Sequence, residues 1–200
     1  MDTRKTEQHS CDKLLSIEQS KPNERTKYWV AALVQMNTEK KVSSMLSKLG
    51  YHNYVPTQTE IHQWSDRKKK VERIVIPMIV FVLVNKGEEN ILRNNSFIYK
   101  FISYPGQKEA AIIPDEQIEK LKFMLHHADS AVEFSEYVYE IGEEVEIIRG
   151  PLKGLYGELC YTEQGKPMMG VYVNLLGYSY VSVDIKDVKP RKKRNMMCAK

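Results

Sequence analysis

A chain of 200 residues can form one large domain or two small ones, and its 42% hydrophobic residues can build either kind of core. Its three cysteines lack CxxC spacing, and no window approaches the roughly 20 apolar residues of a membrane span. The sequence therefore argues against a disulfide framework, a zinc site and a membrane protein, and it predicts a cytoplasmic location. The net charge of +4 is divided unevenly, because residues 27–127 carry 15 basic and 10 acidic groups whereas residues 129–188 carry 4 and 11. This division predicts two domains with different partners, the first closer to nucleic acid.

The N-terminal part reads as a polar extension followed by an ordered module. Residues 1–26 hold few apolar side chains, so we predict a disordered extension there. The apolar run over residues 28–34 is typical of a buried strand. An amphipathic helix follows it and stops at Gly50.

The middle of the chain predicts a hairpin, a central strand and two helices. Residues 57–61 and residues 71–76 are expected to pair as a hairpin around a basic loop. The β-branched run over residues 78–84 favours a strand covered on both faces. The remaining predicted elements are a helix over 88–95, a strand over 97–103, a helix over 114–127, and a linker over 128–137 that holds few packing residues.

A glycine-rich turn lies in the C-terminal third. A β-branched strand is broken at Gly150 and Pro151, where proline presets φ and glycine allows a positive φ. Gly154 and Gly157, three residues apart, suit a bulged or closely approached backbone. Short strands separated by turn signals follow, so we predict a small barrel over residues 138–190 and a basic tail over 191–200.

No set of residues in the sequence indicates catalysis or a cofactor. The five histidines have no partner at metal-ligand spacing, and neither a nucleophile-elbow motif nor a phosphate-binding loop occurs. We therefore predict a protein that is not an enzyme and that holds no metal and no cofactor.

The order of these elements, with particular residues, resembles the NusG family of transcription elongation factors over roughly residues 27–190. The turn at Gly150 and Pro151 looks like a KOW motif. The other anchors are Tyr28-Trp29-Val30, Glu39 to Val42, Tyr54 to Thr57, Arg67 to Arg73, Ile76-Pro77 and Phe81-Val82.

This resemblance implies an α+β fold in two domains. The first is an N-terminal NGN domain over residues 27–127, an α/β sandwich with an antiparallel sheet, and the second is a C-terminal KOW domain with an SH3-like β-barrel over residues 138–190. The polar N-terminal extension is similar to that of UpxY-type antiterminators of capsular polysaccharide operons, which are specialised paralogues in the family.

The resemblance also assigns a polymerase-binding surface. Family members grip the clamp helices of the RNA polymerase β′ subunit with an apolar depression, which matches Ile76, Ile79 and Phe81 here, with Tyr28 or Trp29 at its edge. The alternative is that these side chains are core, because alternation sends Ile79 and Phe81 to one face that a helix could cover.

Two polar segments match further contacts of the family. Glu88, Glu89 and Asn90 occupy the place of a contact with the polymerase β subunit. The hairpin residues Arg67, Lys68, Lys69, Lys70 and Arg73 would face upstream or non-template DNA and neutralise phosphates; the alternative is a solvated tip.

The resemblance thus implies a monomeric, non-enzymatic transcription elongation factor or antiterminator. It would bind the polymerase clamp and suppress pausing and termination, while the KOW domain recruits a second partner, a ribosomal protein or a termination factor. The alternative function is an RNA-binding KOW protein of the ribosome or of its assembly. The net charge of −7 over residues 129–188 argues against that alternative, because a ribosomal KOW module is expected to be basic.

Overall fold

The computed structural model describes residues 26–63, 68–135, 141–162 and 164–191, so the predicted extension and tail lie almost wholly outside the described residues. The elements of its N-terminal part are β1 (Tyr28–Leu33), α1 (Glu39–Lys48), β2 (His52–Tyr54), β3 (Thr57–Gln63), β4 (Lys68–Ile74), β5 (Ile79–Val84), α2 (Lys86–Arg93), β6 (Lys100–Phe101) and α3 (Asp115–His127). Those of its C-terminal part are β7 (Glu133–Ser135), β8 (Ile141–Ile147), β9 (Tyr156–Tyr161), β10 (Pro167–Val173), β11 (Gly177–Ser182), a 3₁₀ helix η1 (Ile185–Asp187) and β12 (Val188–Pro190).

The N-terminal sheet has the antiparallel order β2-β5-β1-β6 and is covered on both faces. Alternation along β5 sends Val80 and Val82 into one core cluster with residues of α1 and α2. It sends Ile79 and Phe81 into a second cluster with the apolar residues of α3. The predicted α+β fold and the strand covered on both faces are therefore confirmed.

Helix α1 positions the turn that leads into β5. Its first residue, Glu39, is buried, and its Oε1 accepts a hydrogen bond of 2.8 Å from the backbone N–H of Met78. Met78 has a φ of +63°, a left-handed conformation that side chains other than glycine rarely adopt. The buried carboxylate thus stabilises the turn at Ile76 and Pro77, which sets where β5 begins.

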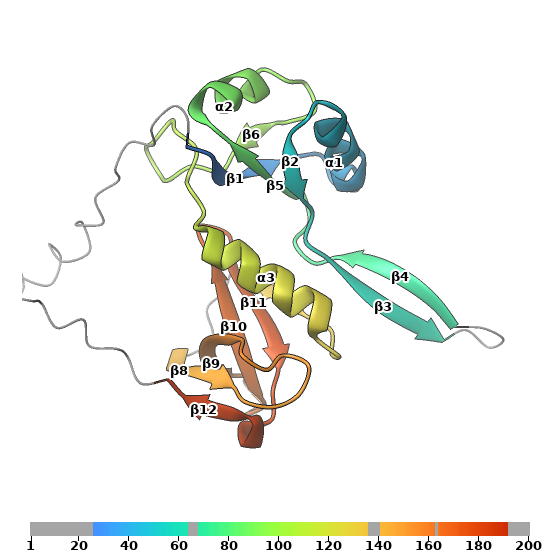
Figure 1. Cartoon of the computed structure of the whole chain (residues 1–200), viewed down its shortest axis with the longest axis vertical. Helices are drawn as coiled ribbons and strands as arrows, with labels where there is room; N and C mark the ends of the chain where they lie inside the picture. Colours follow the sequence, from blue (N-terminus) through green and yellow to red (C-terminus); the bar gives the residue numbers. More distant parts are fainter. Residues whose placement is uncertain (1–25, 64–67, 136–140, 163, 192–200) are drawn as a thin grey trace, which may run out of the picture.

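Strands β3 and β4 form the predicted hairpin as a ribbon that projects from the rest of the molecule (Figure 1). Its register runs from Thr57 opposite Ile74 at the base to Gln63 opposite Lys68 near the tip. The ribbon is a separate two-stranded sheet, so only its base is close to the remaining elements.

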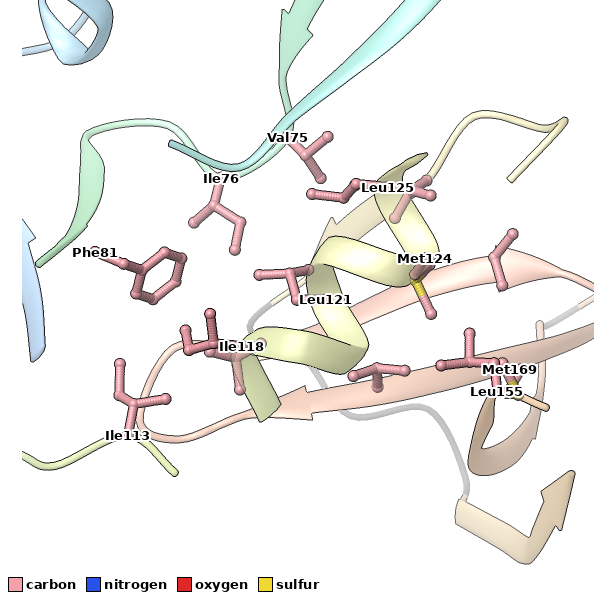
Figure 2. Packing of buried hydrophobic residues seen from close by; sticks show 14 of the residues in the cluster. Val75, Ile76, Phe81, Ile113, Ile118, Leu121, Met124, Leu125, Leu155 and Met169 are labelled. Carbon is pink, nitrogen blue, oxygen red and sulfur yellow. The ribbon is translucent and has the colours of Figure 1, made fainter. Parts of the chain in front are cut away.

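Helix α3 lies between the N-terminal module and the C-terminal strands (Figure 1). It begins after Pro114, and its buried side chains are Ile118, Leu121, Met124 and Leu125. Figure 2 shows these side chains between Ile76 and Phe81 on one side and Leu155 and Met169 on the other. One continuous apolar cluster therefore joins the two halves of the chain through α3.

The C-terminal strands form a six-stranded antiparallel sheet in the order β12-β8-β9-β10-β11-β7, consistent with a KOW domain. The first strand of this sheet, β7, lies inside the segment predicted as a linker. Its backbone pairs with β11, and the preceding Val132 is fully buried. The prediction of an unpacked linker over 128–137 is thus wrong for residues 132–135, because the sheet partner comes more than 40 residues later in the chain.

The glycine-rich turn has the backbone that its sequence predicts. Gly150 and Gly154 have φ values of +80° and +88°. A Cβ atom on Gly157 would overlap the carbonyl oxygen of Gly170 in the neighbouring strand β10. The predicted close approach of the backbone is therefore confirmed at Gly157.

We predict that Gly157→Ala lowers the free energy of unfolding by about 2–3 kcal/mol, because the backbone of β9 and β10 must separate to admit the methyl group. The control is Gly87→Ala in α2, where the added Cβ meets only Asn85 Oδ1 at 3.4 Å. That change should be neutral or should stabilise by about 0.5 kcal/mol, since alanine favours a helix. Urea unfolding followed by circular dichroism measures both, and equal effects would contradict the strand-packing argument.

Candidate functional site

The structure brings four of the predicted polymerase-binding residues together and covers them. Trp29, Ile76, Ile79 and Phe81 share one apolar cluster and are each at most 5% exposed. Tyr28 points to the opposite face of β1 and joins the other cluster. In this conformation the side chains pack as core under α3, which is the arrangement that the sequence left as the alternative; their binding role stays a prediction.

An aromatic group that the sequence assignment did not include extends this face. Tyr54 of β2 stacks on Phe81 with ring centroids 6.2 Å apart, and His52 lies 5.5 Å from Trp29. The Tyr54 hydroxyl is buried with no hydrogen-bond partner in the described part of the chain, and burial raises the pKa of this phenol. The segment Tyr54 to Thr57 was the available sequence signal, because it is one of the family anchors.

Lys122 of α3 contacts the aromatic rings of this group. Its Nζ lies 5.1 Å from the ring centroid of Trp29 and 5.4 Å from that of Tyr54, and it pairs with Glu119 at 2.8 Å. Cation–π contacts of this kind contribute about 0.5–1 kcal/mol each at exposed sites. Cation–π contacts therefore add to the apolar packing that holds α3 against Trp29, Tyr54 and Phe81.

The acidic residues at the start of α2 form hydrogen bonds and ion pairs with other residues of the chain. Glu88 forms a capping box with Asn85 and an ion pair of 3.3 Å with Lys27. Glu89 is 1% exposed and accepts hydrogen bonds from the Tyr28 hydroxyl at 2.9 Å and from Arg93 Nη2 at 2.5 Å. Of the three residues predicted to touch the β subunit, Asn90 is exposed, whereas Glu89 is buried and Glu88 is half-buried.

Opposing effects act on the pKa of Glu89. Burial raises it, but the hydrogen bonds from Arg93 and Tyr28 and the charge of Lys86 outweigh burial and hold the pKa below its usual value. A carboxyl group whose pKa is lower in the folded state than in the unfolded state stabilises the fold above the unfolded-state pKa. That contribution disappears as the pH falls through the folded-state pKa.

We therefore predict that Glu89→Gln lowers the free energy of unfolding by about 2 kcal/mol at pH 7, since charge-assisted hydrogen bonds are lost. The difference from the wild type should shrink as the pH falls below about 4, where the unfolded-state carboxyl takes up a proton before the folded-state carboxyl does. Urea unfolding at pH 7, 5 and 3 measures this difference. A difference that stays constant across the three pH values would contradict the role of the charge.

The basic ribbon divides into a tip and a base. Lys69 and Lys70 are exposed, Lys68 belongs to β4, and Arg67 lies outside the described residues. Arg73 lies at the base, where it forms an ion pair with Glu60 and donates a hydrogen bond of 2.8 Å to the carbonyl oxygen of Val132. Arg73 therefore binds partners within the chain, whereas Lys69 and Lys70, with which the sequence grouped it, are exposed.

Polar contacts also join α3 and its flanks to the C-terminal sheet. Asn174, in the turn after β10, donates its backbone N–H to Gln117 Oε1 in α3 at 2.8 Å. Its side-chain Nδ2 donates to the Tyr104 hydroxyl at 2.8 Å and to the carbonyl oxygen of Ile112 at 3.0 Å. These contacts hold the module at the N-terminal end of α3.

The predicted KOW-motif residues border a hollow on the C-terminal module. Gly150 and Pro151 line a cavity of about 760 Å³ together with residues around η1. Gly154 lies on the far side of the same turn, in a second cavity beside α3, and Gly157 lies in the closely packed start of β9. The motif therefore shapes the turn and one wall of the first cavity.

Two kinds of site are absent from the described residues. No group of three or more His, Cys, Asp or Glu side chains there could hold a metal ion. No helix in that part of the chain is long and apolar enough to cross a membrane.

The chain is similar in sequence to several known proteins. A family model described as "Transcription termination factor nusG" matches residues 27–122. The chain is 26% identical over 149 residues to the "Transcription termination/antitermination protein NusG" of Staphylococcus carnosus, which covers 72% of this chain and 80% of that protein. It is 27% identical over 150 residues to the protein of the same name from Bacillus subtilis, covering 72% and 82%. A solved structure titled "Domain interaction in Thermotoga maritima NusG" aligns with a TM-score of 0.48 at 18% identity, over 85% of this chain and all of that one.

Proposed function

We propose that this chain is a transcription elongation factor and antiterminator of the NusG family that binds the RNA polymerase clamp through its N-terminal module. The observation that carries the proposal is the family match over residues 27–122, which runs from β1 into α3 and includes the whole candidate face. Binding would stabilise the closed clamp, provided that the protein binds the closed clamp more tightly than the open one. Pausing and termination would then be suppressed without any enzymatic step.

The proposed face must be uncovered before it can bind. Ile76, Ile79 and Phe81 are buried beneath α3, so the clamp helices can reach them only in a conformation in which α3 has moved. The protein would then have two conformations, and the described one is the closed conformation, in which α3 covers the face. Its apparent affinity for polymerase is lowered by the fraction of molecules in which the face is open.

We predict that Ile79→Ala weakens the binding of purified core polymerase at least tenfold, because the truncation removes apolar surface from the proposed face. The matched control is Val80→Ala, the next residue of β5, whose side chain is also buried but points to the α1 and α2 side. Affinity is measured at a temperature at which circular dichroism finds both variants folded. Equal loss in the two variants would show that stability, not the face, controls binding.

The ribbon tip supports a contact with DNA. Lys69 and Lys70 are exposed on a projecting two-stranded element, where each lysine can neutralise a phosphate without reading sequence. We propose that the ribbon lies along upstream or non-template DNA when the N-terminal module is bound to polymerase.

We predict that replacing Lys69 and Lys70 with alanine lowers DNA crosslinking in the elongation complex and reduces the salt dependence of DNA binding by about two phosphate contacts. The control replaces Lys41 and Lys48, two exposed lysines of α1, and so removes the same charge from another surface. Crosslinking that falls equally in both double variants would indicate a general charge effect instead of a contact at the ribbon.

We also propose that the acidic C-terminal module recruits a second protein, a ribosomal protein or a termination factor. The cavity beside Gly150 and Pro151 supports this role, since it offers a concave surface on a module of net negative charge. Linked modules bind a second partner at high effective concentration.

A finer assignment rests on the polar N-terminal extension. We propose that the chain is a specialised paralogue of the UpxY type that acts on a capsular polysaccharide operon. A coding position at the head of a long polysaccharide gene cluster would support this assignment, and a position among general transcription and translation genes would argue against it.

A further inference from the structure

The segment that leaves α3 is tied to the base of the β3–β4 ribbon by a buried amide. Gln58 is 3% exposed, although glutamine is mostly a surface residue. Its Nε2 donates to the carbonyl oxygen of Ser130 at 2.8 Å and, more weakly, to that of Ala128 at 3.5 Å. Its Oε1 accepts from the backbone N–H of Val132 at 2.8 Å. One side chain thus satisfies three backbone groups of a five-residue segment.

Arg73 holds the same segment from the neighbouring strand. Gln58 and Arg73 are directly opposite each other in the β3–β4 register. Arg73 donates to the carbonyl oxygen of Val132, so Val132 is bound through both its N–H and its C=O. Val132 is fully buried, and the three residues after it form β7, which pairs with β11 of the C-terminal sheet.

We propose that Gln58 and Arg73 form a latch that holds residues 128–132 to the ribbon base and keeps α3 and the C-terminal module docked over Ile79 and Phe81. The latch would regulate access to the polymerase-binding face, so this part of the inference rests on the proposed function. Its location supports this role, because residues 128–132 connect the end of α3 to the first strand of the C-terminal sheet.

The latch consists of hydrogen bonds, and such contacts suit a reversible opening of residues 128–132 from the ribbon base. Hydrogen bonds contribute little net stability when water can replace the partner, whereas exposing the apolar residues of α3 is costly. Asn174 anchors the opposite end of α3 through its own hydrogen bonds. Release at Gln58 therefore weakens the polar attachment at the C-terminal end of α3, where Met124 and Leu125 still pack, while the N-terminal end keeps its hydrogen bonds.

The first test measures amide hydrogen exchange in the full chain and needs no polymerase. Gln58→Ala should speed exchange at Val132 and in β7 about tenfold, because the Val132 N–H loses its acceptor and the segment can open. Thr59→Ala is the matched control, since Thr59 is the adjacent residue, is exposed and points to the other face of the ribbon. Exchange in β1 and β5 should stay unchanged in both variants, which separates local opening from global destabilisation.

A second variant keeps the test decisive if Gln58→Ala does not fold. Gln58→Glu retains an acceptor for the Val132 N–H but cannot donate to Ser130 or Ala128 when ionised. It should give a smaller increase in exchange than Gln58→Ala. Exchange at residues 132–135 that matches Thr59→Ala in every folded Gln58 variant would overturn the latch.

The second test measures affinity for purified core polymerase. Gln58→Ala should bind about tenfold more tightly than the wild type, because the open fraction rises. If the wild type and the variant bind equally, the regulatory role of the latch is overturned. If neither binds polymerase while exchange has increased as expected, the proposed function fails and the hydrogen-bonded latch is supported.

Discussion

The two-sided burial of α3 is the constraint on which the remaining structure depends. A helix of 13 residues is at the limit of what is stable alone in water, so α3 requires partners for its apolar side chains. It finds them on both sides, in the face of β5 and in the strands of the C-terminal sheet. Each fully buried leucine or isoleucine contributes about 1.5–3 kcal/mol, which makes the two modules mutually dependent through one element.

This shared packing determines what the protein can present to a partner. The side chains proposed to bind an apolar partner pack against α3, so under the proposed function docking and binding would compete for one surface. The polar contacts at the two ends of α3 then adjust the balance. Hydrogen bonds at Gln58 and Asn174 are exchangeable with water at modest cost, whereas the apolar contacts between them define the two alternative packings.

Several charged residues have structural partners that compete with a binding role. Glu88 caps α2, Glu89 neutralises Arg93 inside the module, and Arg73 binds the backbone of Val132. Their side chains come from segments that look polar and exposed in sequence, but each already has a hydrogen-bond partner within the chain. Binding through one of these charges would compete with its contacts inside the chain, whereas Lys69 and Lys70 are exposed on a projecting element.

Local patterns in the sequence predict the local elements: a β-branched apolar run identified β5, helical spacing identified α3, and glycine spacing identified the close approach at Gly157. Ile76, Ile79 and Phe81, which the sequence grouped, share one apolar cluster because their relative positions follow from one turn and one strand, while their binding role stays a prediction. Three features follow from long-range packing instead: α3 covers this group, residues 133–135 join a distant sheet, and Gln58 and Arg73 bind the segment before them. The reason is physical: periodicity specifies which face of an element is apolar, but the partner of that face, and of each buried polar group, is set by contacts between residues far apart in the chain.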